Sequence, residues 1–388
     1  MKFRRSAPAI LIASVVVVVA AMTFLTNRLF SGLTGAVEAG QFALMRSSVE
    51  TSLRDEAVRA LARAELVAQN PSVRAAFAAR DRDRLLAETR DMYVVQHERY
   101  GIDQMAFHVP PATIFLRVHN PPRAGDNVGV IRPIVETVNR TRAAQRGLAF
   151  SISTGPGTFG IVPVRDAQGN HVGSLEVGVD IGPMIDGLKA RFGVEATLFV
   201  DERQLRQFSS GLGGEVFSEQ NRVGRYLKFH STNWGLMQRL VRPSDIAVAS
   251  ADAVTYPRGA SGRDWGVLLL PVSSASGAHL GVVAVARDFS ATRAAAGRSL
   301  VWQLLLAVFA VVVLSAMVLI VLRGVLLQPL AQVASRLAAL AAGGEPPPVD
   351  DVSRECEEIR ALAQSYEALR LAAGHPPAAP RADDEGDE

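Results

Sequence analysis

The sequence contains a single cysteine, Cys356, and its formal net charge is only +3 over 388 residues. The scarcity of cysteine excludes a fold held by disulfide bonds, so any large domain must be stabilised by burial of apolar side chains. The balanced charge excludes a strongly basic nucleic-acid-binding protein and an acidic disordered chain. The sequence also lacks a compelling nucleophile, phosphate-loop or paired-carboxylate motif, so we expect no enzymatic activity and no cofactor.

Two long apolar runs without a charged residue, 7–25 and 300–322, dominate the hydropathy pattern. Each is long enough to cross a hydrocarbon layer of roughly 30 Å as a helix. Basic residues before the first run and Arg323 after the second predict that both termini are cytoplasmic. We therefore predict a bacterial inner-membrane protein with residues 1–6 in the cytoplasm and 26–299 in the periplasm. A cleaved signal peptide is the alternative interpretation of the first run.

The segment between the two runs changes character along its length. Residues 34–70 carry apolar residues at helical spacing without an interior proline, which predicts one long helix. After Asn70-Pro71, a second amphipathic stretch at 82–99 ends near the glycine stop Gly101. Short apolar runs between turn residues then predict β-strands. The predicted strands are residues 104–108, 113–119, 150–152, 160–164, 171–180, 266–272 and 279–288.

Part of the segment is repeated at an offset of 108 positions. Residues 163, 164, 167, 169, 171, 173, 177 and 180 are identical to the residues 108 positions later. Eight identities in an ungapped window of 18 residues indicate an internal repeat, although a general likeness among glycine-turn hairpins is the alternative. We predict an α+β fold in which the long helix carries two tandem modules, a membrane-distal one at 71–182 and a proximal one at 194–290.

The stretch 100–119, YGIDQMAFHVPPATIFLRVH, resembles the Phe-His-x-Pro-Pro-Ala segment of one subclass of the double Cache sensor domains. Such domains occur in bacterial chemoreceptors, sensor kinases and cyclic-dinucleotide enzymes, and this subclass is called the double sensory domain. The resemblance continues through Gly125-Asp126 and the hairpin 162–176, and it covers roughly residues 35–290. It implies two PAS-like Cache modules and recognition of a small extracytoplasmic solute. An arginine that usually precedes the Val-Pro strand is replaced here by Phe159 and its neighbours, so its ligand contact is not expected.

Polar residues on the predicted strands are the candidates for the ligand site. Period two places Arg117 and His119 with Phe115 on one face of a strand, opposite Ile114. On a later strand the same rule sets Glu176 opposite apolar neighbours. An arginine can bind a carboxylate and a glutamate can pair with an amine, so an amino acid or a carboxylate would suit a site lined by these residues. The candidate ligand-binding residues are Arg117, His119, Glu176, His108, Phe107 and Asp126.

The repeat suggests which module binds. Glu176 corresponds to Ala284, whereas Asp180 has its counterpart in Asp288, so we expect binding in the distal module and helix capping by the two aspartates. The alternative for Arg117 and Glu176 is a structural salt bridge at the sheet surface. Because both are expected at that surface, we predict that their replacement costs little stability. A metal site is not expected, because the histidines lack a close pair and no cysteine supports them.

Residues 323–373 resemble a HAMP linker. Leucines at seam spacing predict two short heptad helices, and Pro329 and Glu357-Glu358-Ile359 match the family's proline and acidic-acidic-aliphatic motif. An ordinary pair of tail helices is the alternative. Residues 374–388 are rich in proline and acidic residues, which predicts a disordered tail, and no output domain is expected after it.

Together these patterns predict a transmembrane sensor of the chemotaxis or two-component type. We expect it to bind a small solute in the distal module and to signal through the second span and the HAMP-like segment to a separate cytoplasmic protein. The heptad seams favour a homodimer. A membrane adaptor with a degenerate, non-binding sensor domain is the alternative function.

Overall fold

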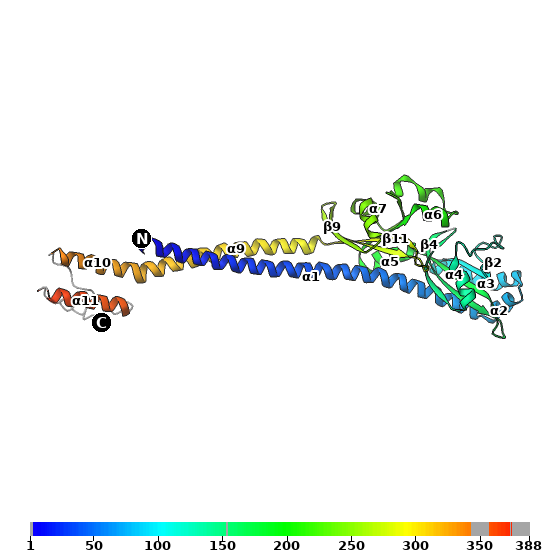
Figure 1. Ribbon diagram of the computed structural model, residues 1–388, viewed down its shortest axis with the longest axis horizontal. Helices are drawn as coiled ribbons and strands as arrows, with labels where there is room; N and C mark the ends of the chain where they lie inside the picture. Colours follow the sequence, from blue (N-terminus) through cyan, green and yellow to red (C-terminus); the bar gives the residue numbers. More distant parts are fainter. Residues whose placement is uncertain (1–2, 153, 343–356, 373, 375–388) are drawn as a thin grey trace, which may run out of the picture. The chain divides into compact units, whose positions relative to one another are not determined.

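The computed structural model of the chain describes residues 3–152, 154–342, 357–372 and 374. The chain divides into two compact units, one built from residues 1–33 and 295–388 and the other from residues 34–294. Figure 1 shows the elements of each unit. The helices are α1 (Phe3–Gln69), α2 (Pro71–Ala78), α3 (Arg82–Tyr100), α4 (Pro133–Thr141), α5 (Gly182–Phe192), α6 (Glu202–Phe208), α7 (Trp234–Leu240), α8 (Pro243–Ala249), α9 (Ser290–Val321), α10 (Gln328–Ala341) and α11 (Glu357–Ala372).

Strands are confined to the unit of residues 34–294 among the described residues, where short 3₁₀ turns η1 (Gly214–Phe217) and η2 (Glu219–Asn221) also occur. The strands are β1 (Ile102–Val109), β2 (Thr113–Arg117), β3 (Gln145–Ser151), β4 (Gly155–Arg165), β5 (His171–Asp180), β6 (Glu195–Asp201), β7 (Arg222–Val223), β8 (Tyr226–Ser231), β9 (Val254–Ala260), β10 (Arg263–Ser273) and β11 (His279–Asp288).

The unit of residues 1–33 and 295–388 holds the two apolar runs. Two helical stretches, Pro8–Gln69 and Ser290–Ala341, each contain a window apolar enough to cross a membrane, and neither window is buried. A π-helical segment, η3 (Leu322–Leu327), leads into α10, and α10 and α11 pack together by burying Val333 and Tyr366. The connector expected at 343–356, which contains Cys356, and almost all of the acidic tail lie outside the described residues.

The predicted helix break at Asn70-Pro71 and the stop at Gly101 are present and have clear local causes, whereas the start predicted at residue 34 is not, because α1 runs without a break from Phe3 to Gln69. The side chain of Asn70 caps α2 by accepting a hydrogen bond of 3.0 Å from the Ser72 backbone N–H, directly before Pro71. Asp81 caps α3 in the same way. Helix α3 ends at Gly101, whose φ of 67° is the left-handed conformation typical of a glycine helix stop.

Two separate antiparallel sheets confirm the prediction of two tandem modules. We use "first module" for residues 71–182 and "second module" for 194–290. The first sheet has the strand order β2-β1-β5-β4-β3 and the second has the order β7-β8-β6-β11-β10-β9. An inner strand of each sheet directly follows a helix that ends at a left-handed glycine, Gly101 before β1 and Gly193 before β6.

The repeat is visible in the strand boundaries themselves. β4 starts at Gly155 and β10 at Arg263, 108 positions later, and β5 and β11 are related by the same offset at both ends. A Cβ added at Gly173 or at its repeat partner Gly281 would lie 2.2 or 2.1 Å from a backbone oxygen of the neighbouring strand. The close approach of two backbones therefore requires glycine at the same place in both hairpins.

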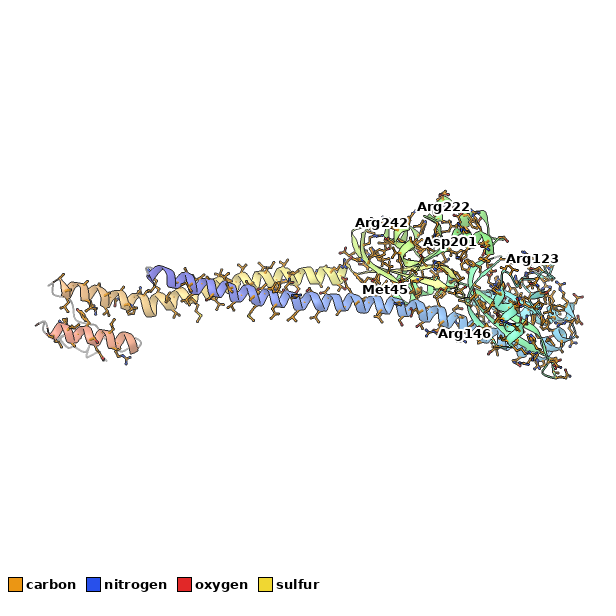
Figure 2. All side chains as sticks on the ribbon, viewed as in Figure 1. Met45, Arg123, Arg146, Asp201, Arg222 and Arg242 are labelled. Carbon is orange, nitrogen blue, oxygen red and sulfur yellow. The ribbon has the colours of Figure 1, made fainter. Side chains whose placement is uncertain are left out.

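The long helix α1 packs along both modules within this unit. Its buried face includes Met45 and Val49 in a core with the second sheet, and Ala60 and Ala64 in a core with the first sheet. Figure 2 labels Met45, which is only 2% exposed. Small residues let the helix approach closely, and at Gly160 a Cβ would lie 2.2 Å from the α1 backbone. This packing covers one face of each sheet and leaves the other face to be filled differently in the two modules.

Candidate ligand-binding site

A polar cavity of about 280 Å³ lies in the first module, against strands β1, β2 and β5. Its walls also come from α3, from the loop after β2 and from the end of β3. The lining residues are Tyr93, His97, Asp103, Gln104, Ala106, His108, Ile114, Arg117, His119, Asn120, Arg123, Val128, Arg132, Phe150, Ser151, Ile152, Thr154 and Glu176.

Arg117 is held in this wall by a two-pronged ion pair. Its Nη1 and Nη2 atoms donate hydrogen bonds of 2.6 and 2.7 Å to the two carboxylate oxygens of Asp126, and Nη1 also donates to the Arg123 carbonyl oxygen at 2.9 Å. The bond from Arg117 lowers the pKa of the Asp126 carboxyl. Arg117 is 7% exposed, so the pair fixes a buried guanidinium beside the cavity.

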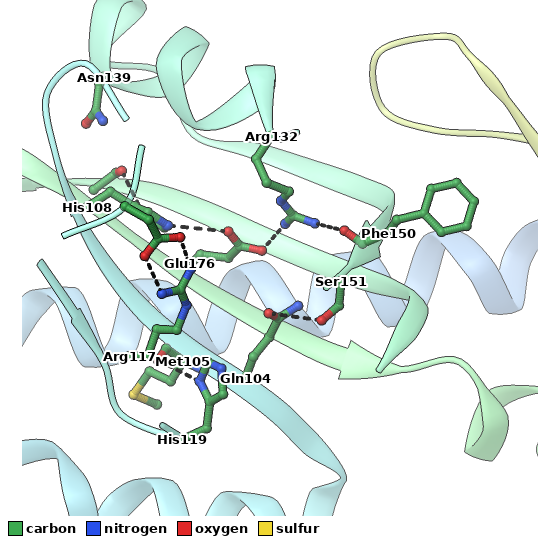
Figure 3. Close-up of polar contacts among 12 residues, drawn as sticks. Gln104, Met105, His108, Arg117, His119, Arg132, Asn139, Phe150, Ser151 and Glu176 are labelled. Atoms are coloured by element: carbon green, nitrogen blue, oxygen red, sulfur yellow. Dashed lines mark hydrogen bonds and ion pairs between the residues drawn. The ribbon is translucent and has the colours of Figure 1, made fainter. Parts of the chain in front are cut away.

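Glu176 forms the second ion pair, with Arg132 on the loop before α4 (Figure 3). Arg132 also donates a hydrogen bond of 2.8 Å to the Phe150 carbonyl oxygen, and its guanidinium lies 5.0 Å from the Phe159 ring centroid. Burial lowers the pKa of Arg132 to about 10, so it remains charged at neutral pH. Glu176 is only 4% exposed and Arg117 only 7%, so neither lies at the sheet surface, and the reason for expecting their replacement to cost little stability is absent.

His108 completes the group around Glu176 as a neutral imidazole. Its side chain is 1% exposed, and burial together with the positive charges of Arg132 and Arg117 lowers its pKa to about 3. The Nε2 atom lies 3.7 Å from a Glu176 carboxylate oxygen, and Nδ1 lies 3.5 Å from the Ser174 hydroxyl. Since the imidazole is uncharged, Arg132 is the group that neutralises Glu176.

An acidic and aromatic end closes the cavity near α3. The Tyr93 hydroxyl donates to the Asp103 carbonyl oxygen at 3.1 Å, and its ring stacks on His97 with 5.6 Å between centroids. Burial and the nearby Asp180 raise the pKa of the Asp103 carboxyl, although a hydrogen bond with Thr154 opposes this. Among the described residues neither Asp103 nor Arg123 forms a direct ion pair, although His97 acts on the pKa of Asp103, and Arg123 helps to lower the pKa of Asp126.

The structure brings four of the predicted site residues together around the cavity, namely Arg117, His119, Glu176 and His108. Burial lowers the pKa of His119 to about 4, and its Nδ1 atom lies 3.2 Å from the Met105 carbonyl oxygen. Asp126 lies behind Arg117 as its partner. Phe107 lies elsewhere, because its ring is fully buried on the other side of the sheet.

The packing on that other side of the sheet also corrects the predicted strand faces. Phe107 and Phe115 each pack against Phe77, at 5.1 and 5.5 Å between ring centroids. Phe115 therefore does not share a face with Arg117, and Ile114 lines the cavity instead. The reason is a β-bulge between β1 and β2, which shifts the register and breaks the alternation. For β5 the alternation holds, and Leu175, Val177 and Val179 pack in the apolar core.

Several cavity residues were not predicted from the sequence. Arg132 lies on a loop, 44 positions before its partner Glu176, so only the tertiary structure pairs them. Asp103 is the second residue of β1, two positions after the glycine stop, and that position was the signal from which it could have been predicted. Gln104 lies on the same strand, 3.4 Å from the Ser151 hydroxyl.

The equivalent position in the second module is apolar. Glu176 lies between Ala106 and Ile161 on the neighbouring strands, whereas Ala284 lies between Thr197 and Leu269. Ala284 is fully buried in a core filled by residues of α7 and α8. The two aspartates lie at helix starts as expected, but Asp180 is not the N-cap of α5, which is Ile181; Asp180 and Asp288 each accept a bond from the backbone N–H of the first helical residue, at 3.2 and 2.8 Å. Within the described residues no cluster of three metal-ligating side chains occurs.

Comparison with known proteins supports a sensory domain. A family model described as "Double sensory domain of two-component sensor kinase" matches residues 41–228. Residues 41–228 are therefore similar to the double sensory domain of two-component sensor kinases. No curated protein matches the sequence.

Comparison with solved structures aligns this chain with three sensory or receptor proteins, each at a TM-score below 0.5. The sensory domain of the Campylobacter jejuni chemoreceptor Tlp3 with bound isoleucine has 10% identity and a TM-score of 0.41, over 68% of this chain and 96% of that one. The Vibrio cholerae histidine kinase DctB sensor domain has 11% identity and a TM-score of 0.37, over 67% and 98%. For an extracellular ligand-binding receptor from Desulfohalobium retbaense the values are 14% and 0.35, and 63% of this chain aligns with only 40% of that chain.

Proposed function

We propose that this chain is a membrane-anchored receptor whose first module binds a small extracytoplasmic solute, and that it has no catalytic activity of its own. One observation carries the proposal. The first module contains a polar cavity of about 280 Å³, whereas the second module fills the repeat-related face with apolar side chains. Polar groups that converge on a concave site fix the orientation of a bound small molecule.

The charges around the cavity favour a zwitterionic solute, with an amino acid as the simplest case. The two ion pairs neutralise Arg117 and Glu176 within the protein, so neither is available as the sole partner of a ligand charge. Asp103 and Arg123 then supply one negative and one positive charge without an ion-pair partner. An ammonium group would pair with Asp103 beside the Tyr93 ring, and a carboxylate would pair with Arg123. Related sensory domains hold isoleucine, valine or asparagine.

A thermal-shift screen of the purified chain with amino acids tests this function. A solute at a hundred times its dissociation constant should stabilise the folded chain by about 2.7 kcal/mol. The variants Asp103→Asn and Arg123→Gln should lose that shift, and Arg146→Gln, an exposed arginine of β3 that does not line the cavity, should keep it. Retention of the full shift in both cavity variants would contradict the proposed charge partners.

We propose the inner membrane as the location, with both termini cytoplasmic. The two apolar windows and their basic flanks support this topology. A periplasm-specific reporter should be active when fused near Gly213 and inactive when fused after Arg370. Activity at both positions would show that the second apolar helix does not cross the membrane.

We further propose that α10 and α11 form a HAMP-like relay in a homodimer and act on a separate cytoplasmic protein. Packing of the two helices buries Val333 and Tyr366 but leaves Leu330 and Leu337 about 40% exposed, seven residues apart. Leu362 and Leu369 on α11 have the same spacing and are also exposed. Exposed leucines at seven-residue spacing favour a second copy as their partner. Cross-linking of single cysteines at 330 and 337 should give dimers, and random or absent cross-linking would count against this arrangement.

A non-binding adaptor is the second candidate function, and the two satisfied ion pairs favour it. Arg117 and Glu176 make good contacts in the absence of any solute, so they are explained by structure alone. The absence of any thermal shift across amino acids and other small carboxylates or amines would favour the adaptor.

A further inference from the structure

Strand β3 connects the cavity to the second module. It is the edge strand of the first sheet and pairs only with β4 within that sheet. An edge strand leaves alternate carbonyl groups without a partner in the sheet. In this chain these carbonyl groups are bonded by other parts of the molecule.

Three alternate carbonyl oxygens along this edge have partners from two sources. The second module holds the outer two, since the backbone N–H group of Ala275 donates to Leu148, and that of Gly211 to Ile152, the residue directly after β3, at 2.9 Å each. Arg132 holds the middle one, at Phe150, with a hydrogen bond of 2.8 Å. The cavity and the second module therefore bond the same five-residue stretch of backbone.

The side chain of Arg132 contacts both this edge and the wall of the cavity. One nitrogen of its guanidinium bonds the Phe150 carbonyl, and another pairs with Glu176 in the cavity wall (Figure 3). Because the guanidinium is planar, a change at one nitrogen moves the other. A ligand group that draws Arg132 away from Glu176 or changes its orientation must therefore disturb its bond to β3.

The side chain of Phe150 extends the contact into the second module. Its ring stacks on Phe208 of α6, with 5.7 Å between centroids and an interplanar angle of 16°. A second, mostly apolar cavity of about 140 Å³ lies beside this ring, lined by residues of both modules including Ile134 and Leu280. In a densely packed interior such free space is what lets a buried ring shift without a clash.

We propose that Arg132 is a positioning residue that couples occupancy of the first-module cavity to the second module through strand β3. This proposal rests on the proposed ligand-binding function and adds the path by which binding in the first module would affect the second module. Occupancy changes the contacts of Arg132, the backbone at Phe150 shifts, and the hydrogen bonds from Ala275 and Gly211 respond together.

Amide hydrogen exchange of the full chain in lipid nanodiscs tests the coupling without a ligand. Arg132→Lys keeps a positive charge for Glu176 but lacks the planar fork that reaches Phe150 at the same time. The amides of Gly211 and Ala275 should exchange about threefold to tenfold faster in this variant, the size expected for one weakened hydrogen bond. The matched control Arg117→Lys alters the other ion pair of the cavity and should leave both amides unchanged.

Equal exchange at Gly211 and Ala275 in the wild type, Arg132→Lys and Arg117→Lys would overturn the coupling. If Arg132→Lys does not fold, Phe208→Leu serves instead, since coupling is reciprocal and should then speed exchange at Phe150. A separate arm adds L-isoleucine, L-valine and L-asparagine to the wild type. If an amino acid binds but exchange at Gly211 and Ala275 does not change, the coupling is contradicted and the ligand-binding function is not. If exchange is faster in Arg132→Lys but none of the amino acids binds, the proposed ligand class is contradicted and the coupling is supported.

Discussion

The two modules share one strand arrangement but fill one face of their sheets in opposite ways. In the second module this face meets α7 and α8, whose buried Leu236, Met237 and Leu240 form an apolar core with Ala284. In the first module the central position holds Glu176, and its surroundings carry charges around a cavity. A single fold thus provides an apolar support in one copy and a candidate site in the other.

The difference shows how a repeated fold can separate stability from recognition. A core of leucine and methionine is stabilised by burial and close packing. A buried ion pair contributes little net stability compared with apolar residues of similar volume, but it fixes charged groups in defined places. The second module therefore suits a supporting role, and the first module carries the polar groups that a solute requires.

The largest effect is expected from breaking the buried ion pair of the first module. Glu176→Ala should lower the free energy of unfolding by about 3–5 kcal/mol, because it leaves the Arg132 guanidinium buried without its partner. The double variant Arg132→Met/Glu176→Met should restore stability to near that of the wild type. Chemical denaturation measures both variants, and a double variant as unstable as Glu176→Ala would mean that the charges are required for folding.

A smaller loss of stability is expected from a substitution in the apolar core of the second module. Leu240→Ala should lower the free energy of unfolding by about 3 kcal/mol, because it opens a cavity in the core of the second module. Its effect on solute binding in the first module should be slight, as measured by calorimetry with any solute that binds the wild type. Loss of binding in this variant would show that solute binding in the first module depends on the core of the second module.

Acid should destabilise the first module through its neutral histidine. Burial lowers the pKa of His108 to about 3, against an ordinary value of 6.5, so the unfolded chain binds the proton more readily between these values. Stability should thus fall as the pH drops from 6.5 towards 3, by about 2 kcal/mol at pH 5 for this residue.

The matched variant His108→Asn isolates this contribution. His119 also has a lowered pKa, of about 4, and adds to the same slope in both proteins. The wild type should therefore lose more stability than His108→Asn between pH 7 and pH 5. Identical pH profiles would show that His108 is not held neutral in the folded chain.

The smallest effect on stability is expected at the mouth of the cavity. Arg123 is exposed and forms no ion pair within the described residues, so Arg123→Gln should change the free energy of unfolding by less than about 0.5 kcal/mol. Its effect on binding of a carboxylate-containing solute should nevertheless be clear. A variant that loses stability rather than binding would assign Arg123 a structural role.

The fold was largely predictable where local chemistry determines it. The bounds of β5 and β11 were predicted to the residue, because turn glycines and alternating apolar residues mark both ends of these strands. The helix break at Asn70-Pro71 and the stop at Gly101 were equally local signals. The seven-residue helices α6, α7 and α8 were not predicted, since so short a segment has little periodicity of its own.

The site was predictable only in part, for a physical reason. Arg117 and Glu176 could be placed on strands by their alternation, but their partners come from loops that only the tertiary fold brings near. A β-bulge opposite His108 moved Phe115 off the expected face, and a bulge has no reliable signal in one sequence. The number of charges around the cavity was thus underestimated, and the residues left without ion-pair partners were not identified.

Methyl NMR of the chain labelled at isoleucine provides the most direct test of where a solute binds. Ile114 and Ile152 line the first-module cavity, whereas Ile246 lies in the apolar core of the second module. Titration with L-isoleucine, L-valine and L-asparagine should shift the methyl signals of Ile114 and Ile152 in a saturable manner and leave Ile246 unchanged. Saturable shifts at Ile246 without shifts at Ile114 and Ile152, or no shift at any of them, would contradict a solute site in the first module.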